Sequence, residues 1–158
     1  MTWQPTTILR FVRALPTSAY TAVVETDCGT GYLKAMGGPE GIHTLACELI
    51  GTQLASWLGL PVFDFALVEV VEEDEIPFIN AKEEQIGKAE PGWAFITRRE
   101  LGEPWGGEVR QLKQLVNPDD ISRLVVFDTW TLNCDRHGPR EKRPLERPRI
   151  NRRNVFLT

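Results

Sequence analysis

The alternation of apolar and polar positions early in the chain predicts a β-hairpin. Residues 21–26 are largely β-branched and alternate in polarity, which is typical of a half-buried strand. Residues 27–31 contain two glycines that can take positive φ, so this segment predicts a turn, and residues 32–36 predict the returning strand. Lys34 lies in the middle of that second strand.

A helical period replaces the alternation after the glycine-rich break at residues 37–41. From about residue 42 to residue 58, apolar side chains recur at three- and four-residue spacing, and Gly59 followed by Pro61 predicts the end of the helix. The apolar stripe comprises Leu45, Leu49, Ile50, Leu54, Trp57 and Leu58.

Two further strands are expected in the middle of the chain. Residues 63–71 are mostly apolar and predict a strand buried on both faces, and residues 92–97 predict another strand. Residues 76–91 between them are polar and poorly patterned, so they predict a short helix or a loop.

The clearest helix start in the sequence lies near residue 118. A short helical stretch at residues 109–115 precedes Asn117, a good capping residue, and Pro118, which suits the first helical position. The predicted helix spans about residues 118–132 and is followed by a polar loop. The side chains that it should bury are Ile121, Leu124, Val125, Phe127 or Asp128, Thr131 and Leu132.

This order of elements predicts an α+β fold in a single domain. A chain of 158 residues with 42% hydrophobic residues can bury a core, and we expect Trp57, Trp93, Trp105 and Trp130 to lie in it. No signal peptide pattern and no apolar run long enough for a bilayer are visible. We therefore expect a cytoplasmic protein without a membrane partner.

Charge is distributed unevenly along the chain. The net charge is −4, yet residues 136–153 hold eight basic residues against Glu141 and Glu146, a local balance of +6. The C-terminal segment is therefore suited to an anion. Nucleic-acid binding ranks low, because the rest of the chain is acidic and no aromatic residue interrupts the basic run.

Two sets of residues could carry chemistry. Lys34 on the hairpin and Glu48 on the following helix match the strand lysine and helix glutamate with which kinases orient ATP phosphates. Each residue alone is also typical of a solvated surface. Asp135, with Arg136 and His137, directly follows the capped helix, and Asp135 and Asn154 could orient a hydroxyl and bind a metal ion. The alternative for this triplet is a solvated turn whose cations favour the helix C-terminus.

The chain resembles HipA-like kinases and the related phosphoinositide-type kinases over roughly residues 20–158. The similarity lies in residues 31–39, 46–49, 117–130, 132–137 and 153–157. The resemblance implies a kinase-like small lobe with an antiparallel sheet and a helix over about residues 1–100, and the start of a helical large lobe over about residues 101–158.

The same resemblance implies ATP and Mg²⁺ as cofactors and assigns roles to residues. Lys34 would contact the phosphates, with Glu48, Gly29 and Gly31 also on the nucleotide side. Asp135 would be the catalytic carboxylate with His137 beside it, and Asn154 and Asp135 would hold the metal. The spatial requirement is that Lys34 and Asp135 face one nucleotide.

The sequence departs from the family in two respects. Asp135 and Asn154 lie 19 positions apart, a longer gap than is usual, and no Asp or Glu follows Asn154 to complete the metal site. We therefore expect a chain that is incomplete at its C-terminus, binds nucleotide weakly and turns over poorly.

Two functions remain open at this point. One is phosphoryl transfer to a protein Ser/Thr or another hydroxyl. The other is a non-catalytic, kinase-derived module that assembles with a partner chain or with a second copy.

Overall fold

The computed structural model describes residues 3–15, 17, 19–80, 82–104, 109–133 and 156–157. The chain divides into two compact units, Met1–Leu54 with Val62–Arg99, and Ala55–Pro61 with Glu100–Thr158. The first unit contains the sheet and most of the first long helix, and the second contains the later helices.

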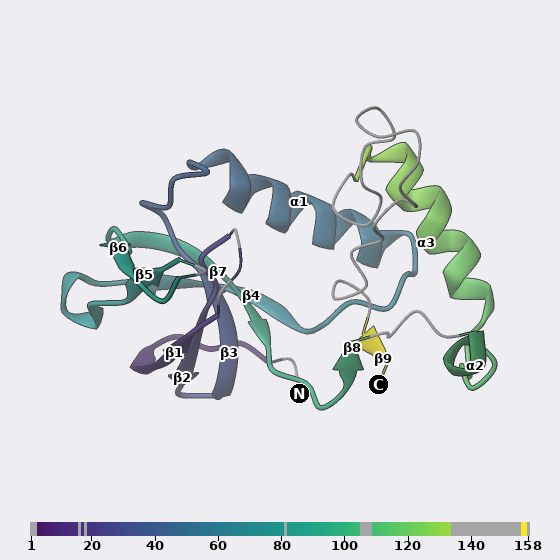
Figure 1. Ribbon diagram of the computed structural model, residues 1–158, viewed down its shortest axis with the longest axis horizontal. Helices are drawn as coiled ribbons and strands as arrows, with labels where there is room; N and C mark the ends of the chain where they lie inside the picture. The colour runs from purple at the N-terminus through teal and green to yellow at the C-terminus, as the bar shows by residue number, and fades with distance from the viewer. Residues whose placement is uncertain are drawn as a thin grey trace. The chain divides into compact units, whose positions relative to one another are not determined.

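The first unit is built on a five-stranded antiparallel sheet in the order β1-β2-β3-β7-β4 (Figure 1). Its strands are β1 (Ile8–Ala14), β2 (Ala22–Thr26), β3 (Gly29–Lys34), β4 (Phe65–Val70) and β7 (Gly92–Arg98). Together with the helices, this sheet confirms the α+β class and is compatible with a kinase-like small lobe.

Strand β1 was not predicted, and its burial shows why. In the run from Ile8 to Ala14 only Ile8 is buried, and the pairing with β2 contains two irregularities, so the strand lacks a clean alternation. An edge strand of this kind gains most of its order from the neighbouring strand rather than from its own pattern.

The predicted hairpin is confirmed as β2 and β3, with a tighter turn than the sequence suggested. Thr26 pairs with Gly29, which leaves Asp27 and Cys28 as the turn residues. Gly29 takes a φ of +107°, a conformation that strongly favours glycine, and Gly31 lies inside the strand.

One face of the sheet carries the hydrophobic core. Alternate apolar residues of β2, β3, β4 and β7, with Leu33 and Ile96 at the centre, are 0–2% exposed. The core residues, from the strands and from the segments that cover this face, are Trp3, Ile8, Ala22, Val24, Leu33, Val68, Val70, Ile76, Phe78, Ala89, Ala94 and Ile96.

A second hairpin helps to close this core. It consists of β5 (Pro77–Ile79) and β6 (Gln85–Lys88), and it follows the 3-10 turn η1 (Glu72–Asp74). The prediction of a short helix or loop at residues 76–91 was therefore wrong. Isolated apolar residues, chiefly Ile76 and Phe78, are buried here among polar neighbours, and so few anchors give no readable period.

Strand β4 lies at the sheet edge and is buried on one face only. Val68 and Val70 are buried, whereas Leu67 is 44% exposed and Glu69 is exposed. The expectation of a strand buried on both faces was wrong, because the apolar residues of the outer face remain partly in water.

Helix α1 (His43–Trp57) lies along the other side of the sheet (Figure 1) and confirms the predicted helix. Ala55 is its one buried residue, and Ile50 of the predicted stripe is 63% exposed. The prediction that Trp57, Trp93 and Trp130 lie in the core was also wrong, since each is exposed, while Trp3 is buried. Trp105 lies outside the described residues.

The second unit contains helices α2 (Val109–Leu112) and α3 (Asp119–Trp130), and the short strands β8 (Glu103–Pro104) and β9 (Phe156–Leu157), which pair antiparallel. Helix α3 confirms the second predicted helix. The side chain of Asn117 does not cap it, since its amide donates to the carboxylate of Asp120 over 2.6 Å.

The burial predicted for α3 was only partly right. Phe127 and Asp128 are both buried, whereas Val125 is 49% and Leu132 80% exposed. Among the described residues, no helix is long and apolar enough to cross a membrane.

Candidate functional site

Lys34 and Glu48 are brought together by the register of β3 and the position of α1. Side chains alternate between the faces of a strand, so Leu33 enters the core and Lys34 points to the opposite face, beside Phe95 of β7. There the Lys34 ammonium donates a hydrogen bond to the Glu48 carboxylate and forms an ion pair with it. The two side chains are 23% and 33% exposed, so the pair is only partly withdrawn from solvent.

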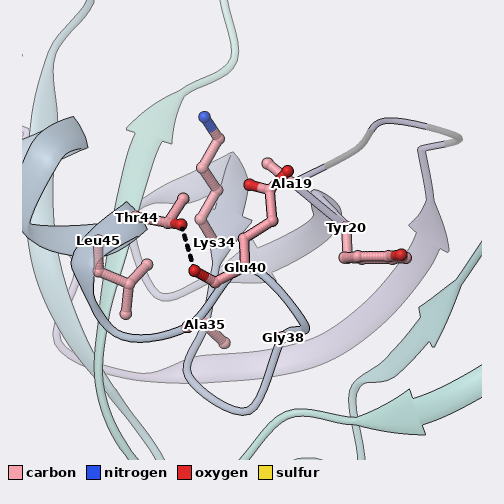
Figure 2. Close-up of a pocket in the computed structure, with 9 residues that line it drawn as sticks. Ala19, Tyr20, Lys34, Ala35, Gly38, Glu40, Thr44 and Leu45 are labelled. Atoms are coloured by element: carbon pink, nitrogen blue, oxygen red, sulfur yellow. Dashed lines mark hydrogen bonds between the residues drawn. The ribbon is translucent and has the colours of Figure 1, made fainter.

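A small hollow lies beside Lys34. It is lined by Ala19 and Tyr20 before β2, Lys34 and Ala35 at the end of β3, Gly38, Glu40 and Gly41 in the following loop, and Thr44 and Leu45 at the start of α1. Figure 2 shows Lys34 beside Thr44 and Glu40 in this region. With a volume of about 20 Å³, it has room for a water molecule and not for a whole nucleotide.

The loop between β3 and α1 places the first turn of the helix beside this hollow. Gly37 and Gly41 take φ values of +90° and +77°, and the Gly41 amide donates to the Gly38 carbonyl over 3.0 Å. The Thr44 hydroxyl bonds back to the Glu40 carbonyl (Figure 2). The two glycines thus allow a tight connection that positions the first turn of α1 next to Lys34.

The charge of the hollow is mixed. Lys34 supplies one positive charge, while Glu40 lines the same hollow and Glu48 holds the ammonium. Two carboxylates beside one ammonium would repel a bare polyphosphate, and a divalent cation would reduce that repulsion.

Gly29 and Gly31 are not brought to this hollow. They lie toward the turn end of the hairpin, and Lys34 ends the strand five positions beyond Gly29, about 17 Å away at the rise of a strand. Gly31 has a packing role, because an added Cβ would lie 2.7 Å from Ile96 Cδ1.

Sequence reasoning missed Ala19 and Tyr20. They lie in the connection between β1 and β2, which antiparallel pairing places at the Lys34 end of the sheet. Assigning β1 and then following strand direction would have identified this connection as the neighbour of Lys34.

Asp135, His137 and Asn154 lie outside the described residues. Asn133, the last described residue of the segment that contains α3, lies two positions before Asp135 in the sequence. Within the described part of the chain, no three His, Cys, Asp or Glu side chains are grouped so that they could hold a metal ion.

Two carboxyl groups with lowered pKa values, Glu25 and Asp27, lie on β2 and in the turn that follows it. The Arg10 guanidinium bonds to Glu25 and lowers the pKa of that carboxyl. The hydroxyl and backbone amide of Thr6 bond to Asp27 and lower its pKa below the ordinary value. These pairs stabilise the sheet edge and the hairpin turn, and do not contribute to the hollow.

Comparison with known proteins gives one family match. A family model described as HipA-like kinase matches residues 23–143, which include Lys34, Glu48 and Asp135. No curated protein and no solved structure shows significant similarity to the chain.

Proposed function

The chain belongs to the HipA-like kinase family, and on that premise we propose that it binds ATP with Mg²⁺ and handles the phosphates through Lys34. The observation that carries the proposal is the Lys34–Glu48 ion pair between β3 and α1. A carboxylate that holds an ammonium in one orientation lets it contact a phosphate oxygen with less loss of side-chain entropy.

Asp135 and Asn154 are the residues that we propose for the metal and for the acceptor hydroxyl. Their carboxylate and amide oxygens are the ligands that Mg²⁺ takes in phosphoryl-transfer sites. When bound, Mg²⁺ would neutralise negative charge on the phosphates. This neutralisation matters here because the carboxylates of Glu40 and Glu48 lie near Lys34 and would repel the phosphates.

The proposed reaction is transfer of the γ-phosphoryl group to a protein Ser/Thr or another hydroxyl. The hydroxyl oxygen forms the new bond to phosphorus, the bond to ADP breaks, and Asp135 accepts the hydroxyl proton. Lys34 stabilises the charge on the phosphate oxygens throughout.

Binding of a non-hydrolysable ATP analogue, with and without Mg²⁺, tests the proposal. A charge-assisted hydrogen bond contributes about 1.5–3 kcal/mol, so Lys34→Ala is expected to weaken binding roughly 10- to 100-fold. Glu48→Gln keeps an oxygen acceptor for the ammonium and should have a smaller effect. Asp135→Asn should reduce the strengthening by Mg²⁺.

Lys88→Ala is the matched control. Lys88 is an exposed lysine on β6 of the same unit, and its removal changes net charge by the same amount. Equal effects of the two lysine substitutions, or undiminished binding by Lys34→Ala, would reject Lys34 as the phosphate contact.

A further inference from the structure

Helix α1 presents an uncharged, largely apolar side to solvent. The only Asp, Glu, Lys or Arg among its 15 residues is Glu48, which bonds to Lys34 on the sheet side. The buried Ala55 lies seven positions, or about two turns, from Glu48 and so faces the same way. Ile50 and Trp57 are also about two turns apart, lie on the opposite side, and are 63% and 79% exposed. A solvated helix carries charged or polar side chains on that side, and α1 does not.

The exposed residues of this side have a regular spacing. Ala46, Ile50, Gln53 and Trp57, here called the α1 outer face, follow one another at intervals of four, three and four positions. That spacing is typical of the seam along which two helices pack. Each of the four residues is exposed, so nothing in the described part of the chain covers the seam.

We propose that the α1 outer face binds the same face of a second copy of the chain and forms a twofold-symmetric dimer. Charge favours this occupant. A charged partner would have to bury its ions against a face that offers no counter-charge, which is costly, whereas a second copy brings no charge into the contact. The net charge of −4 opposes association through charged surfaces of two copies, and the outer face avoids that repulsion.

Side-chain size favours an antiparallel arrangement of the two helices. When the pair is centred between Ile50 and Gln53, each Trp57 lies opposite Ala46 of the second copy, so a large side chain meets a small one. A parallel pair would set tryptophan against tryptophan and alanine against alanine, which leaves voids. Antiparallel packing also brings opposite ends of the two helix dipoles together.

The length of α1 limits the strength of this contact. Its 15 residues span about 22 Å, and two such faces bury roughly 1,000 Å² in total, near the lower limit for a specific interface. We therefore expect a reversible dimer whose population rises with concentration. Glu48 lies on the other side of α1, so the contact does not involve the Lys34–Glu48 pair, and the proposal does not depend on nucleotide binding.

Sedimentation velocity of the full chain over a range of concentrations, with its cysteines kept reduced, tests the proposal. The wild-type chain is expected to shift from monomer to dimer as its concentration rises. Ile50→Glu places an unpaired carboxylate in the seam and should raise the dimer Kd at least about 100-fold. Trp57→Ala removes the largest side chain of the face and should raise it roughly 30-fold.

Leu9→Glu is the matched control. Leu9 is 64% exposed, as Ile50 is to within one per cent, and lies on β1 rather than on α1. A wild-type monomer at every concentration, or equal weakening by Ile50→Glu and Leu9→Glu, would overturn the proposal. Circular dichroism establishes that each variant is folded, and Trp57→Ala carries the same comparison with Leu9→Glu if Ile50→Glu is not.

A double variant tests the direction of the two helices. In the antiparallel pair, position 50 of one copy lies opposite position 53 of the other, so adding Gln53→Lys to Ile50→Glu should recover part of the lost association. In a parallel pair the introduced like charges would face each other. Association no stronger than that of Ile50→Glu alone would reject the antiparallel arrangement.

Discussion

Leu132, with a φ of +52°, shows how one residue can carry conformational strain at a helix end. A branched residue in the left-handed region costs about 1–2 kcal/mol, whereas glycine there costs little in the folded state. Glycine also makes the unfolded chain more flexible, which favours unfolding by about 0.4–1 kcal/mol. Because the relieved backbone cost is larger, Leu132→Gly is expected to stabilise the second unit by roughly 0.5–1 kcal/mol. Because Leu132 is 80% exposed, little apolar burial is lost. Urea denaturation measures the change.

Leu132→Ala is the control for this prediction. Alanine keeps a Cβ and therefore keeps the conformational cost, so its midpoint should not rise. A gain from alanine equal to that from glycine would mean that the leucine side chain, and not its backbone conformation, is unfavourable.

Asp27 should contribute a pH-dependent part of the stability of the hairpin turn. The pKa of Asp27 is lowered in the folded chain, chiefly by the hydrogen bond from the Thr6 hydroxyl. The ionised carboxylate therefore stabilises the fold fully above the unfolded pKa of about 3.9. This stabilisation is lost as the pH falls through the folded pKa. Asp27→Asn should therefore lower the urea midpoint at pH 7, and the difference from wild type should shrink below about pH 4. A difference that is constant between pH 7 and pH 2 would contradict this assignment.

Strand β3 depends on glycine at a buried position. A Cβ at Gly31 would meet Ile96 Cδ1 at 2.7 Å and the Thr97 carbonyl oxygen at 3.0 Å. Gly31→Ala is therefore expected to destabilise the first unit by about 1–3 kcal/mol, the usual cost of overpacking. Thermal unfolding followed by circular dichroism measures the change.

Gly51 in helix α1 provides the opposite case. A Cβ there would have no heavy atom within 4 Å, and alanine favours a helix over glycine by about 1 kcal/mol. Gly51→Ala should therefore raise the melting temperature. If Gly31→Ala also raised the melting temperature, the packing around Gly31 would be looser than its contacts indicate.

The elements that the sequence predicts well are those with a long, regular period. The β2–β3 hairpin, both long helices and β7 have enough consecutive patterned residues to be identified. The β5–β6 hairpin was missed because Phe78 and Ile76 act as isolated anchors, and β1 because a single residue of it is buried. The large exposed residues, such as Trp93 on β7, show that apolar character alone does not predict burial.

At the scale of the molecule, the sheet and its core are contained in the first part of the chain. All five strands of this sheet and every residue of the buried cluster on its face lie between residues 3 and 98. We therefore expect a fragment of residues 1–99 to unfold cooperatively with the sheet signal of the full chain in circular dichroism.

A fragment of residues 1–88 is the control. It lacks β7, which pairs with both β3 and β4, so its strands cannot form one sheet and it should be unfolded. An unfolded 1–99 fragment would show that the sheet requires residues beyond Arg99.

Half of the candidate site could be predicted from the sequence. Lys34 and Glu48 are single polar residues within patterned elements, and their pairing follows once the strand and the helix are recognised. The assignment of Gly29 and Gly31 to the nucleotide side stays a prediction from the resemblance, and the structure adds only that they lie toward the turn end of the hairpin. The roles of Asp135, His137 and Asn154 stay predictions, since these residues lie outside the described part of the chain.

The alternation along β3 makes the length of its distant turn critical for chemistry. One residue inserted between Asp27 and Cys28 could be absorbed in the turn, but an insertion that shifted the strand would exchange the two faces. The ammonium would then enter the apolar interior and Leu33 would face Glu48. A register shift of a single position, introduced at a turn about 20 Å from Lys34, would therefore abolish both the core and the Lys34–Glu48 ion pair.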